Sequence, residues 1–284
     1  MYVSMKNMLD AANSQNYAVM AINCFNLETA RTVISAAEEE KAPVIVNIFY
    51  EHLLTHCDSA IIVPIVKTLA QRASVDVALN LDHGQEEDYI LRAIDDGFSS
   101  VMVDMSRFDL EENIQRTKKV AEYAHERGVS VEGEIGCLGA SEDGKYTLDK
   151  MYTDPDQAKS FYERTGIDAL AISIGTSHGN YPEGMVPKFD FERLQKIKSL
   201  TKAPLVLHGG SGSGEENILN SVKYGINKIN VGCDFMNKNL SSAKEFIKEN
   251  PSINYFDLIH GVEKESREIV KYYIGLSGSK GKNK

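Results

Sequence analysis

The chain has 284 residues, 42% of them hydrophobic and 25% charged, which is ordinary for a soluble protein with one substantial core. Its 41 acidic residues exceed its 31 basic residues, and the net charge of −10 disfavours nucleic acid and anionic membrane surfaces as partners. No segment offers about 18 uninterrupted apolar residues, and the four cysteines form no CxxC pair. These features argue against a membrane span, a disulfide framework and a thiolate zinc site, and we expect one large domain in the cytoplasm.

Short apolar or β-branched segments recur along the chain, each bounded by turn residues and followed by a stretch with helical spacing. Eight such segments are predicted to be strands: 17–23, 43–48, 76–82, 100–105, 129–135, 168–174, 204–209 and 226–232. Between them lie amphipathic segments such as 112–128, which has Ile114, Val120 and Ala124 near one helical face. The alternation predicts an α/β fold, and eight units at this length favour a (β/α)8 TIM barrel over a doubly wound open sheet.

Three segments add to this pattern. Residues 136–152 form a connection longer than a usual βα loop, and we consider it a candidate mobile active-site loop. The stretch from about 254 to 274 predicts an additional C-terminal helix, which we expect to cap the barrel, with a subunit contact as the alternative. The barrel domain is predicted to cover residues 1–276. The glycine-rich, basic residues 277–284 are predicted to form a flexible tail, with a tail that folds over a neighbouring site as the alternative.

Polar residues cluster at the predicted strand ends, where the reactive groups of a barrel of this kind gather. They are Asp82-His83-Gly84, Asp104, Glu132 and Glu134, Thr176-Ser177-His178-Gly179, His208-Gly209-Gly210, and Asn230. Three imidazoles from separate strands suit a catalytic zinc ion, because three nitrogen ligands leave a fourth position open for substrate. A single strand-end histidine is more often an ordinary polar residue, so the prediction depends on His83, His178 and His208 together.

Other histidines show that the residue type alone is not diagnostic. His260-Gly261 repeats the strand-end dipeptide within the C-terminal helical region, where no barrel strand ends. His52 and His56 have the spacing of one helical face and follow the second strand, which leaves a substrate contact open for them. The sequence does not assign a role to His52, His56 or Phe49.

The segment 209–217, GGSGSGEEN, precedes a predicted helix, and its glycines allow several backbone N–H groups to point at one anion. No Walker lysine follows it, so a loop without a ligand is the alternative, but phosphate sites often follow strands seven and eight of a barrel.

Asp82 precedes a predicted ligand and is a candidate for proton transfer or for orienting that ligand. Asp104 and Glu134 are candidates for metal-related roles, and Glu142 and Asp143 lie on the long loop.

The same residues resemble the class II ketose-bisphosphate aldolases, particularly the branch that contains tagatose-bisphosphate aldolases. The likeness covers essentially the whole chain. Its motifs are LDHG at 81–84, SVMVD at 100–104, VSVEGEIG at 129–136, SEDG at 141–144, ALAISIGTSHGNY at 169–181, PLVLHGGSG at 204–212 and KINVG at 228–232.

The resemblance implies an enzyme of carbohydrate metabolism, such as glycolysis. It would cleave a ketose phosphate, tagatose or fructose 1,6-bisphosphate, into dihydroxyacetone phosphate and an aldehyde such as glyceraldehyde 3-phosphate. One zinc ion would stabilise the enediolate as a Lewis acid, without a covalent intermediate. The family pattern also leaves room for a second metal location and a monovalent cation, and it implies a homodimer or homotetramer.

Residue by residue, the resemblance implies that His83, His178 and His208 bind zinc, and that Asp82 donates a proton to the aldehyde oxygen. Asp104 and Glu134 match the second metal location. Glu142 matches the loop acid that exchanges the proton on the dihydroxyacetone carbon. The positions that match the substrate and phosphate pocket are Asn23, Gly179, Gly209, Gly210, Ser211, Asn230, Val231, Gly232 and Cys233.

Several residues depart from the family pattern. Gly232 stands where fructose-specific members often have Asp, which favours the tagatose type. Phe49 and Tyr50 replace small or hydroxylated residues, Pro182 replaces a lysine, and Cys233 replaces a hydroxyl residue. These departures concern the aldehyde half of the substrate more than the dihydroxyacetone phosphate half.

Three alternatives stay open from the sequence. An aldolase that forms a Schiff base would use Lys228, the one well-placed lysine. A class II aldolase for a different ketose 1-phosphate fits the unusual aldehyde side. A non-catalytic sugar-phosphate-binding companion subunit is the third, although it would have no need to keep Asp82 beside three histidines.

Overall fold

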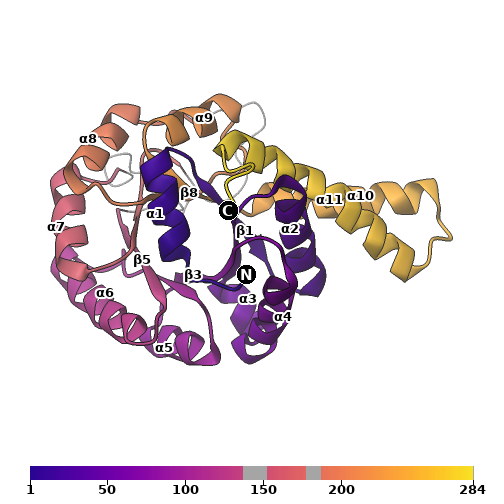
Figure 1. The fold of residues 1–284 in the computed structure, drawn as a ribbon, viewed down its shortest axis with the longest axis horizontal. Helices are drawn as coiled ribbons and strands as arrows, with labels where there is room; N and C mark the ends of the chain where they lie inside the picture. The colour runs from indigo at the N-terminus through magenta and orange to yellow at the C-terminus, as the bar shows by residue number, and fades with distance from the viewer. Residues whose placement is uncertain (137–151, 177–186, 284) are drawn as a thin grey trace.

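The computed structural model describes residues 1–136, 152–176 and 187–283. In this part of the chain eight parallel strands close into a barrel in sequence order, so the predicted (β/α)8 TIM barrel is confirmed (Figure 1). The strands are β1 (Val19–Cys24), β2 (Val44–Phe49), β3 (Val77–Gly84), β4 (Ser100–Val103), β5 (Ser130–Ile135), β6 (Ala169–Ile172), β7 (Leu205–Leu207) and β8 (Ile226–Val231).

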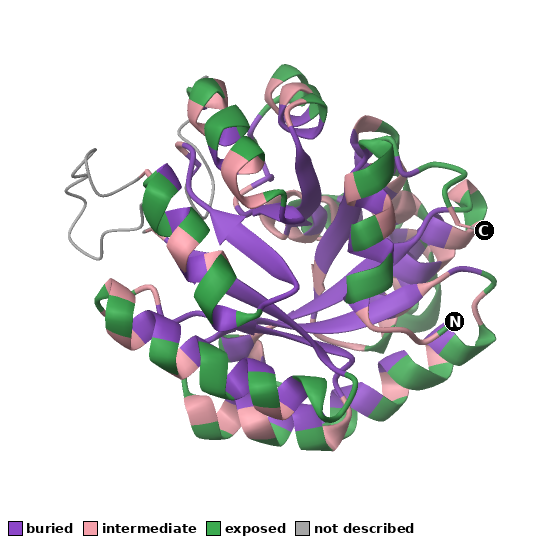
Figure 2. Ribbon diagram, turned by 60° about the vertical axis from the view of Figure 1, so that its left-hand side comes forward, coloured by how far each residue is buried: buried purple, intermediate pink, exposed green. Residues whose placement is uncertain are grey.

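Helices surround this barrel, and most of them cover its outer face (Figure 1). They are α1 (Met5–Gln15), α2 (Leu27–Glu40), α3 (Tyr50–Thr55), α4 (Ser59–Arg72), α5 (Glu87–Asp96), α6 (Leu110–His125), α7 (Pro155–Thr165), α8 (Phe191–Thr201), α9 (Glu215–Lys223), α10 (Cys233–Glu249) and α11 (Tyr255–Ser277). Figure 2 shows the strands buried at the centre, while the helices alternate between buried and exposed positions. Within the described residues, every helix is too short or too polar to span a bilayer.

The inward-facing positions of the barrel change from apolar to polar along each strand. On β3 the alternate residues Ala78, Asn80 and Asp82 are all buried, and Ala78 belongs to the apolar cluster at the amino end. On β5 the corresponding residues are Glu132 and Glu134. Since parallel strands share one direction, the polar residues meet at the carboxyl rim, where a barrel places its functional groups.

The amino end of the barrel is closed by α1, which crosses the barrel opening in Figure 1. Ser4 begins this helix by accepting a hydrogen bond from the Lys6 N–H. Met5 and Leu9 are fully buried against inward-facing strand residues such as Met102. Burying a side chain of this size stabilises a fold by about 1.5–3 kcal/mol, so α1 contributes to the stability of this end.

The C-terminal helices form a hairpin that extends away from the barrel (Figure 1). The additional C-terminal helix is confirmed, but the expectation that it caps the barrel is wrong, because α11 packs along the side against α2 and α9. Its later residues, including Val270 and Ile274, are buried there, whereas Tyr255 and Phe256 at its start are exposed. In this position α11 also contacts β1 and fills the place between α9 and α2 in the ring of helices.

The C-terminal residues expected to be a flexible tail lie against the barrel up to Asn283. The Gly281 N–H donates to the Glu40 carbonyl, and the Asn283 N–H donates to the Lys41 carbonyl, both at 3.0 Å. The Asp76 N–H donates to Asn283 Oδ1 at 2.7 Å. The domain boundary at residue 276 and the flexibility of residues 277–284 both stay predictions, and these bonds place the segment beside the C-terminal end of α2.

Candidate active site

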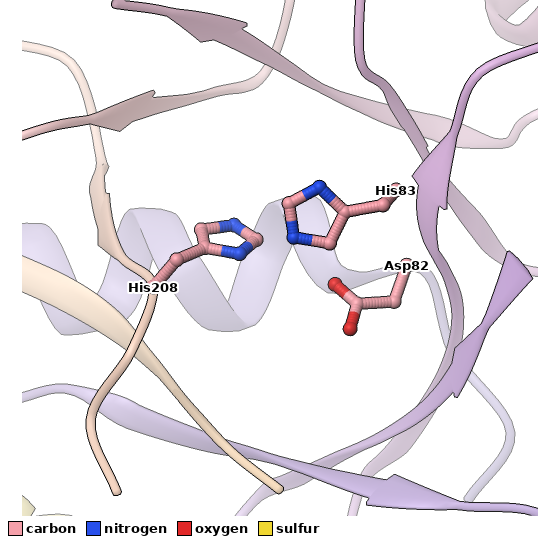
Figure 3. A group of neighbouring side chains, drawn as sticks. All are labelled: Asp82, His83 and His208. Carbon is pink, nitrogen blue, oxygen red and sulfur yellow. The ribbon is translucent and has the colours of Figure 1, made fainter. Parts of the chain in front are cut away.

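His83 and His208 meet at the carboxyl rim, at the ends of β3 and β7. Their ring centroids lie 4.7 Å apart, and Figure 3 shows the two imidazoles facing one another beside Asp82. Both side chains are buried. His83 has a φ of +52°, a left-handed conformation that costs a non-glycine residue about 1 kcal/mol or more. Backbone strain of this kind is typical of functional positions, where it fixes the direction of a side chain.

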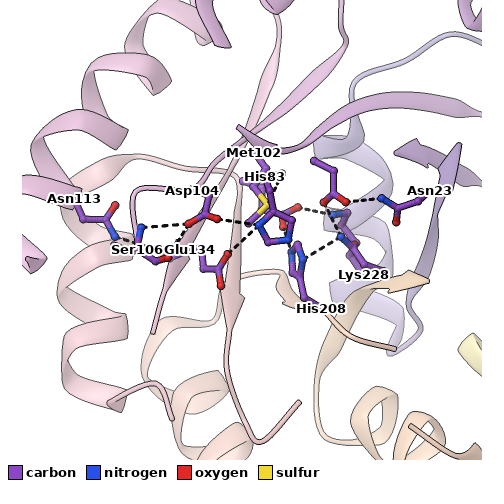
Figure 4. A network of polar contacts seen from close by, with 12 residues as sticks. Asn23, His83, Met102, Asp104, Ser106, Asn113, Glu134, His208 and Lys228 are labelled. Atoms are coloured by element: carbon purple, nitrogen blue, oxygen red, sulfur yellow. Dashed lines mark hydrogen bonds and ion pairs between the residues drawn. The ribbon is translucent and has the colours of Figure 1, made fainter. Parts of the chain in front are cut away.

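Two carboxylates lie on the outer side of His83. Its Nδ1 is 2.9 Å from Asp104 Oδ2 and 3.7 Å from Glu134 Oε2 (Figure 4). A carboxylate accepts a hydrogen bond, so the Nδ1 of His83 carries a proton, and its Nε2 has a free lone pair once the ring is neutral. Ser106 Oγ donates to the other oxygen of Asp104 at 2.7 Å. The predicted neighbourhood of His83, Asp104 and Glu134 is therefore present.

Asp82 is held by two asparagine side chains, from β1 and from β8. Asn23 Nδ2 donates to its Oδ2 at 2.7 Å, and Asn230 Nδ2 donates to its Oδ1 at 2.9 Å. Burial raises the pKa of Asp82, but the nearby His83, His208 and Lys228 outweigh burial. The pKa of Asp82 therefore lies below its usual range. Asp82 is thus a buried, oriented carboxylate beside both imidazoles.

Glu132 links His208 to Lys228 in the interior of the barrel. Its Oε1 lies 2.7 Å from His208 Nε2, and Lys228 Nζ donates to its Oε2 at 2.6 Å. Because Glu132 accepts from Nε2, the lone pair of His208 is on Nδ1. Lys228 and Glu132 are both 0% exposed, and Lys228 is not among the described residues that line the cavity below. This ion pair occupies the amine that a Schiff-base mechanism would need.

Negative charge exceeds positive charge in this buried region. Asp82, Asp104, Glu132 and Glu134 face one lysine, Lys228, and Glu134 Oε2 is buried without a hydrogen-bond partner among the described residues. Burial and then the nearby Asp104 raise the pKa of Glu134 well above its usual range. A buried carboxylate without a partner is costly, and a bound cation would satisfy it.

The pKa of His83 also points to a missing positive charge. Burial lowers this pKa, but the hydrogen bond to Asp104 and the other carboxylates outweigh burial and raise it to about 9. A metal ion must displace this proton to bind the ring. Two groups of residues each bring their potential ligand atoms within 4.8 Å of one another. The first is Asp82 with His83 and His208, and the second is His83 with Asp104 and Glu134. Imidazole nitrogens with carboxylate oxygens nearby fit a zinc ion.

A cavity of about 220 Å³ opens beside these groups. The described residues that line it are Asn23, Phe49, Asp82, His83, His208, Gly209, Ser211, Asn230, Gly232 and Cys233. Two residues of the predicted pocket do not line it: Gly210, and Val231, whose side chain is fully buried. The cavity therefore joins the predicted metal site to the predicted phosphate segment.

The phosphate side of the cavity is built from the loop after β7 and the start of α10. Ser211 Oγ accepts from the N–H groups of Gly232 and Asp234, each at 3.2 Å, which fixes the two loops together. A Cβ at Gly210 would lie 2.7 Å from the Asn230 carbonyl oxygen, so only glycine allows this close approach. The N-terminus of α10, a helix of 17 residues, begins at Cys233 beside the cavity and favours an anion there.

Some predicted residues lie outside the described residues, and some contacts were not predicted. His178, Gly179, Glu142 and Asp143 fall in the segments 137–151 and 177–186. Glu132 and Lys228 are each recognisable in the sequence, but nothing in their spacing predicts that they pair. Ser106 is a further unpredicted contact, and its position two residues after Asp104 is the signal that identifies it as a partner of that carboxylate.

Comparisons with known proteins agree with this geometry. Residues 3–282 match the family model described as fructose-bisphosphate aldolase class-II. A fructose-bisphosphate aldolase of Geobacillus stearothermophilus is 40% identical over 253 residues, which cover 88% of each chain.

Two solved structures are also similar over nearly the full length. The crystal structure of the YdjI aldolase from Escherichia coli K12 has a TM-score of 0.87 and 33% identity, with 100% of both chains covered. A putative fructose-1,6-biphosphate aldolase from Coccidioides immitis has a TM-score of 0.86 and 32% identity, over 97% of this chain and 96% of that one.

Proposed function

Because the chain belongs to the class-II fructose-bisphosphate aldolase family and is an aldolase, a carbon–carbon lyase, we propose that it cleaves a ketose phosphate to dihydroxyacetone phosphate and an aldehyde. The reaction is reversible and zinc-dependent, since class-II aldolases depend on zinc in general. The observation that best supports this proposal is that His83, His208 and Asp82 lie close together and line a cavity. Ser211 and Gly232 line the same cavity. We place the enzyme in the cytoplasm, within carbohydrate metabolism such as glycolysis.

Each residue of the site has a role in this proposal. His83 and His208, together with His178, would hold the zinc ion, which would supply Lewis-acid chemistry at the substrate carbonyl when bound. Asp104 and Glu134 provide a second metal location. Asp82, fixed by Asn23 and Asn230, takes the proton from the substrate hydroxyl in cleavage and returns it to the aldehyde oxygen in synthesis. Glu142 exchanges the proton on the dihydroxyacetone carbon.

The phosphate of the dihydroxyacetone half binds at Gly179, Gly209–Ser211 and Asn230–Cys233, with a monovalent cation as a further participant. Short N–H-bearing segments and the start of α10 supply the donors that a phosphate needs. Tagatose and fructose 1,6-bisphosphate are the substrates to test first, because the relatives carry the fructose name and Gly232 favours the tagatose type. A different ketose 1-phosphate is the alternative, favoured by Phe49 on the cavity wall.

We further propose that the enzyme is a homodimer or homotetramer. The hairpin of α10 and α11 carries exposed apolar side chains, Leu240, Ile247, Tyr255 and Phe256, and a second copy of this chain would cover them. The molar mass in solution, measured by light scattering, checks this assembly.

Metal removal tests the function directly. We expect dialysis against a strong chelator to abolish the release of dihydroxyacetone phosphate from either bisphosphate, and zinc or cobalt to restore it. The matched measurement treats the enzyme with borohydride in the presence of substrate. Activity that survives the chelator and is trapped by borohydride would support a lysine Schiff base at Lys228 and contradict the proposal.

A further inference from the structure

The loop that follows β7 reaches the cavity at Ser211 and is bound by Asp234, in the first turn of α10. The Gly212 N–H donates to Asp234 Oδ2 at 3.1 Å, and the Asp234 N–H donates to Ser211 Oγ at 3.2 Å. Ser211 lines the cavity, whereas Gly212 and Asp234 are not among the described residues that line it. Asp234 therefore contacts the loop and not a molecule in the cavity.

The carboxylate of Asp234 is in turn bound by Tyr273 of α11. The Tyr273 hydroxyl donates to Asp234 Oδ2, the same oxygen that accepts from the Gly212 N–H. Tyr273 is 5% exposed, and burial and then this hydrogen bond raise its pKa above the usual range. The phenol is therefore protonated near neutral pH and is always able to donate. Tyr273 thus selects the position of the oxygen that the Gly212 N–H reaches.

Helix α11 gives this contact a fixed base. It packs against α9 and β1 on the same side of the barrel as the loop (Figure 1). Ile274, the residue after Tyr273, is fully buried, and the Ala18 N–H donates to the Ser277 carbonyl at 2.9 Å. A side chain on a helix packed in this way has few alternative positions.

The preceding residue, Tyr272, provides a comparison on the same helix. Its side chain is 45% exposed, and its hydroxyl lies 3.5 Å from Glu215 Oε2, at the limit of a hydrogen bond. The ring centroids of Tyr272 and Tyr273 are 5.4 Å apart, edge to face. Two adjacent tyrosines therefore share the same helix, but only Tyr273 reaches the carboxylate that binds the loop.

We propose that Tyr273 and Asp234 are positioning residues for the phosphate of dihydroxyacetone phosphate. They hold Ser211 and Gly212 in the place that accommodates this phosphate, through hydrogen bonds from the Tyr273 hydroxyl and the Gly212 N–H to one carboxylate oxygen. Neither side chain touches the substrate. This inference rests on the proposed function, because the phosphate belongs to the same substrate. It assigns to α11 a role in substrate binding that its place on the outside of the barrel does not suggest.

Kinetics in the direction of synthesis separate phosphate binding from the chemistry at the metal. The zinc-loaded enzyme receives dihydroxyacetone phosphate as the donor and glyceraldehyde, which has no phosphate, as the acceptor. Tyr273→Phe keeps the ring and removes the hydroxyl. We expect the KM for dihydroxyacetone phosphate to rise about three- to tenfold, because one hydrogen bond to the loop carboxylate is lost. The kcat and the KM for glyceraldehyde should stay at the wild-type values.

A second readout uses inorganic phosphate as a competitive inhibitor against dihydroxyacetone phosphate. Its Ki should rise by the same factor as the KM in Tyr273→Phe, because the displaced loop binds both phosphates less well. Tyr272→Phe is the matched control and should have the wild-type KM and Ki. The midpoint of urea unfolding, measured for each variant, shows that the comparison is made on folded protein.

Two substitutions of Asp234 separate its hydrogen bonds from its charge. Asp234→Ala removes the acceptor of both hydrogen bonds, and the KM for dihydroxyacetone phosphate should rise by about tenfold or more. Asp234→Asn keeps one oxygen that accepts from Tyr273 and from the Gly212 N–H, so it should recover most of this loss. An Asp234→Asn variant as impaired as Asp234→Ala would show that the charge matters instead, and would overturn the positioning role.

The combination of Tyr273→Phe with Asp234→Ala tests whether Tyr273 acts through Asp234. Once the carboxylate is removed, the hydroxyl has nothing left to position, so the double variant should have the KM of Asp234→Ala alone. A KM that instead reflects both losses multiplied would show that the two residues act independently. If Asp234→Ala does not fold, Asp234→Asn takes its place, and Tyr273→Phe should then raise the KM in that background as it does in the wild type.

Two further outcomes would contradict the proposal. A fall in kcat at an unchanged KM for dihydroxyacetone phosphate would connect Tyr273 to the chemistry at the metal. Equal losses in Tyr272→Phe and Tyr273→Phe would show a general disturbance of α11. Failure of the proposed function looks different, since the wild-type enzyme would then show no zinc-dependent addition or cleavage.

Discussion

The two ends of the barrel use polar side chains in opposite ways. At the amino end, polar groups pair with one another: Ser100 and Ser130 share a hydrogen bond of 2.8 Å, and Asp168 accepts from His125 and from the Val131 N–H. At the carboxyl rim, Glu134 Oε2 and Asn230 Oδ1 are buried without partners among the described residues. These amino-end groups satisfy one another, whereas the carboxyl rim needs a cation and a substrate to satisfy its polar atoms.

The largest effect is expected at the carboxyl rim. Asp82→Ala removes the group that transfers the proton at the aldehyde oxygen, and we expect kcat for cleavage to fall by about 10²–10⁴-fold. The zinc content of the same sample should equal that of the wild type, because Asp82 is not one of the proposed ligands. Steady-state release of dihydroxyacetone phosphate measures the effect.

A matched substitution at the amino end sharpens the comparison. Asp168 is also a buried aspartate bonded to a histidine, and it forms an ion pair with Lys6 at 3.0 Å. Asp168→Ala should lower the midpoint of urea unfolding and leave kcat unchanged. If Asp82→Ala kept wild-type turnover, the assignment of the proton donor would be wrong; a large fall in kcat for Asp168→Ala would remove the distinction between the two ends.

The buried ion pair of Glu132 and Lys228 lies in the barrel interior. Its loss is expected to have the next largest effect, which is on the free energy of unfolding. Glu132→Leu leaves the Lys228 ammonium buried without its partner, and removing one member of a buried ion pair destabilises a protein by about 3–5 kcal/mol. Glu132→Leu combined with Lys228→Met should recover most of this free energy of unfolding. Chemical denaturation of the single and double variants measures both values.

Zinc affinity distinguishes a positioning role from a purely structural one. Glu132 accepts the hydrogen bond from His208 Nε2, and loss of such a partner weakens metal binding by about 10–100-fold. The double variant should therefore regain stability but not zinc affinity, measured by competition with a chromogenic chelator. Wild-type affinity in the double variant would show that Glu132 serves only the ion pair.

The strands and the rim residues were accessible from the sequence because they follow local rules. Apolar segments bounded by turns identify each strand, and Asp82, His83 and His208 stand out because they end strands. The pairing of Glu132 with Lys228 was not accessible, since it joins β5 to β8 across the barrel interior. Such a contact depends on barrel closure, which spacing along the chain does not specify.

The closure of the amino end was missed for a related reason. Met5 and Leu9 have the spacing of an amphipathic helix, but that pattern does not say which surface the helix covers. The C-terminal helix has a similar pattern, from which we expect it at the end of the barrel, yet it packs along the side. Periodicity therefore predicts that a helix has a buried face and leaves its partner undetermined.

The smallest effect is a pH dependence at the amino end, where Lys198 is held by neutral partners. Its Nζ donates to Asn13 Oδ1 at 2.6 Å, Asn227 Oδ1 at 2.7 Å and the Ala203 carbonyl at 2.8 Å. Burial lowers the pKa of Lys198 to about 8, against about 10.4 in an unfolded chain. The unfolded chain therefore binds more protons between these values, and the cost of the buried charge is full below pH 8 and disappears as pH rises toward 10.4.

Relative to Lys198→Met, the free energy of unfolding of the wild type should rise by about 1–2 kcal/mol between pH 7 and pH 9.5, after allowance for partial exposure. Urea unfolding at the two pH values measures the difference, below the range where tyrosines titrate in an unfolded chain. The turnover of Lys198→Met at pH 7 should equal that of the wild type, because the Lys198 ammonium is already paired with three neutral groups at the amino end and contributes stability alone. A fall in kcat without a change in the pH dependence of unfolding would instead connect this lysine to the reaction, and the amino end would no longer be the passive half of the barrel.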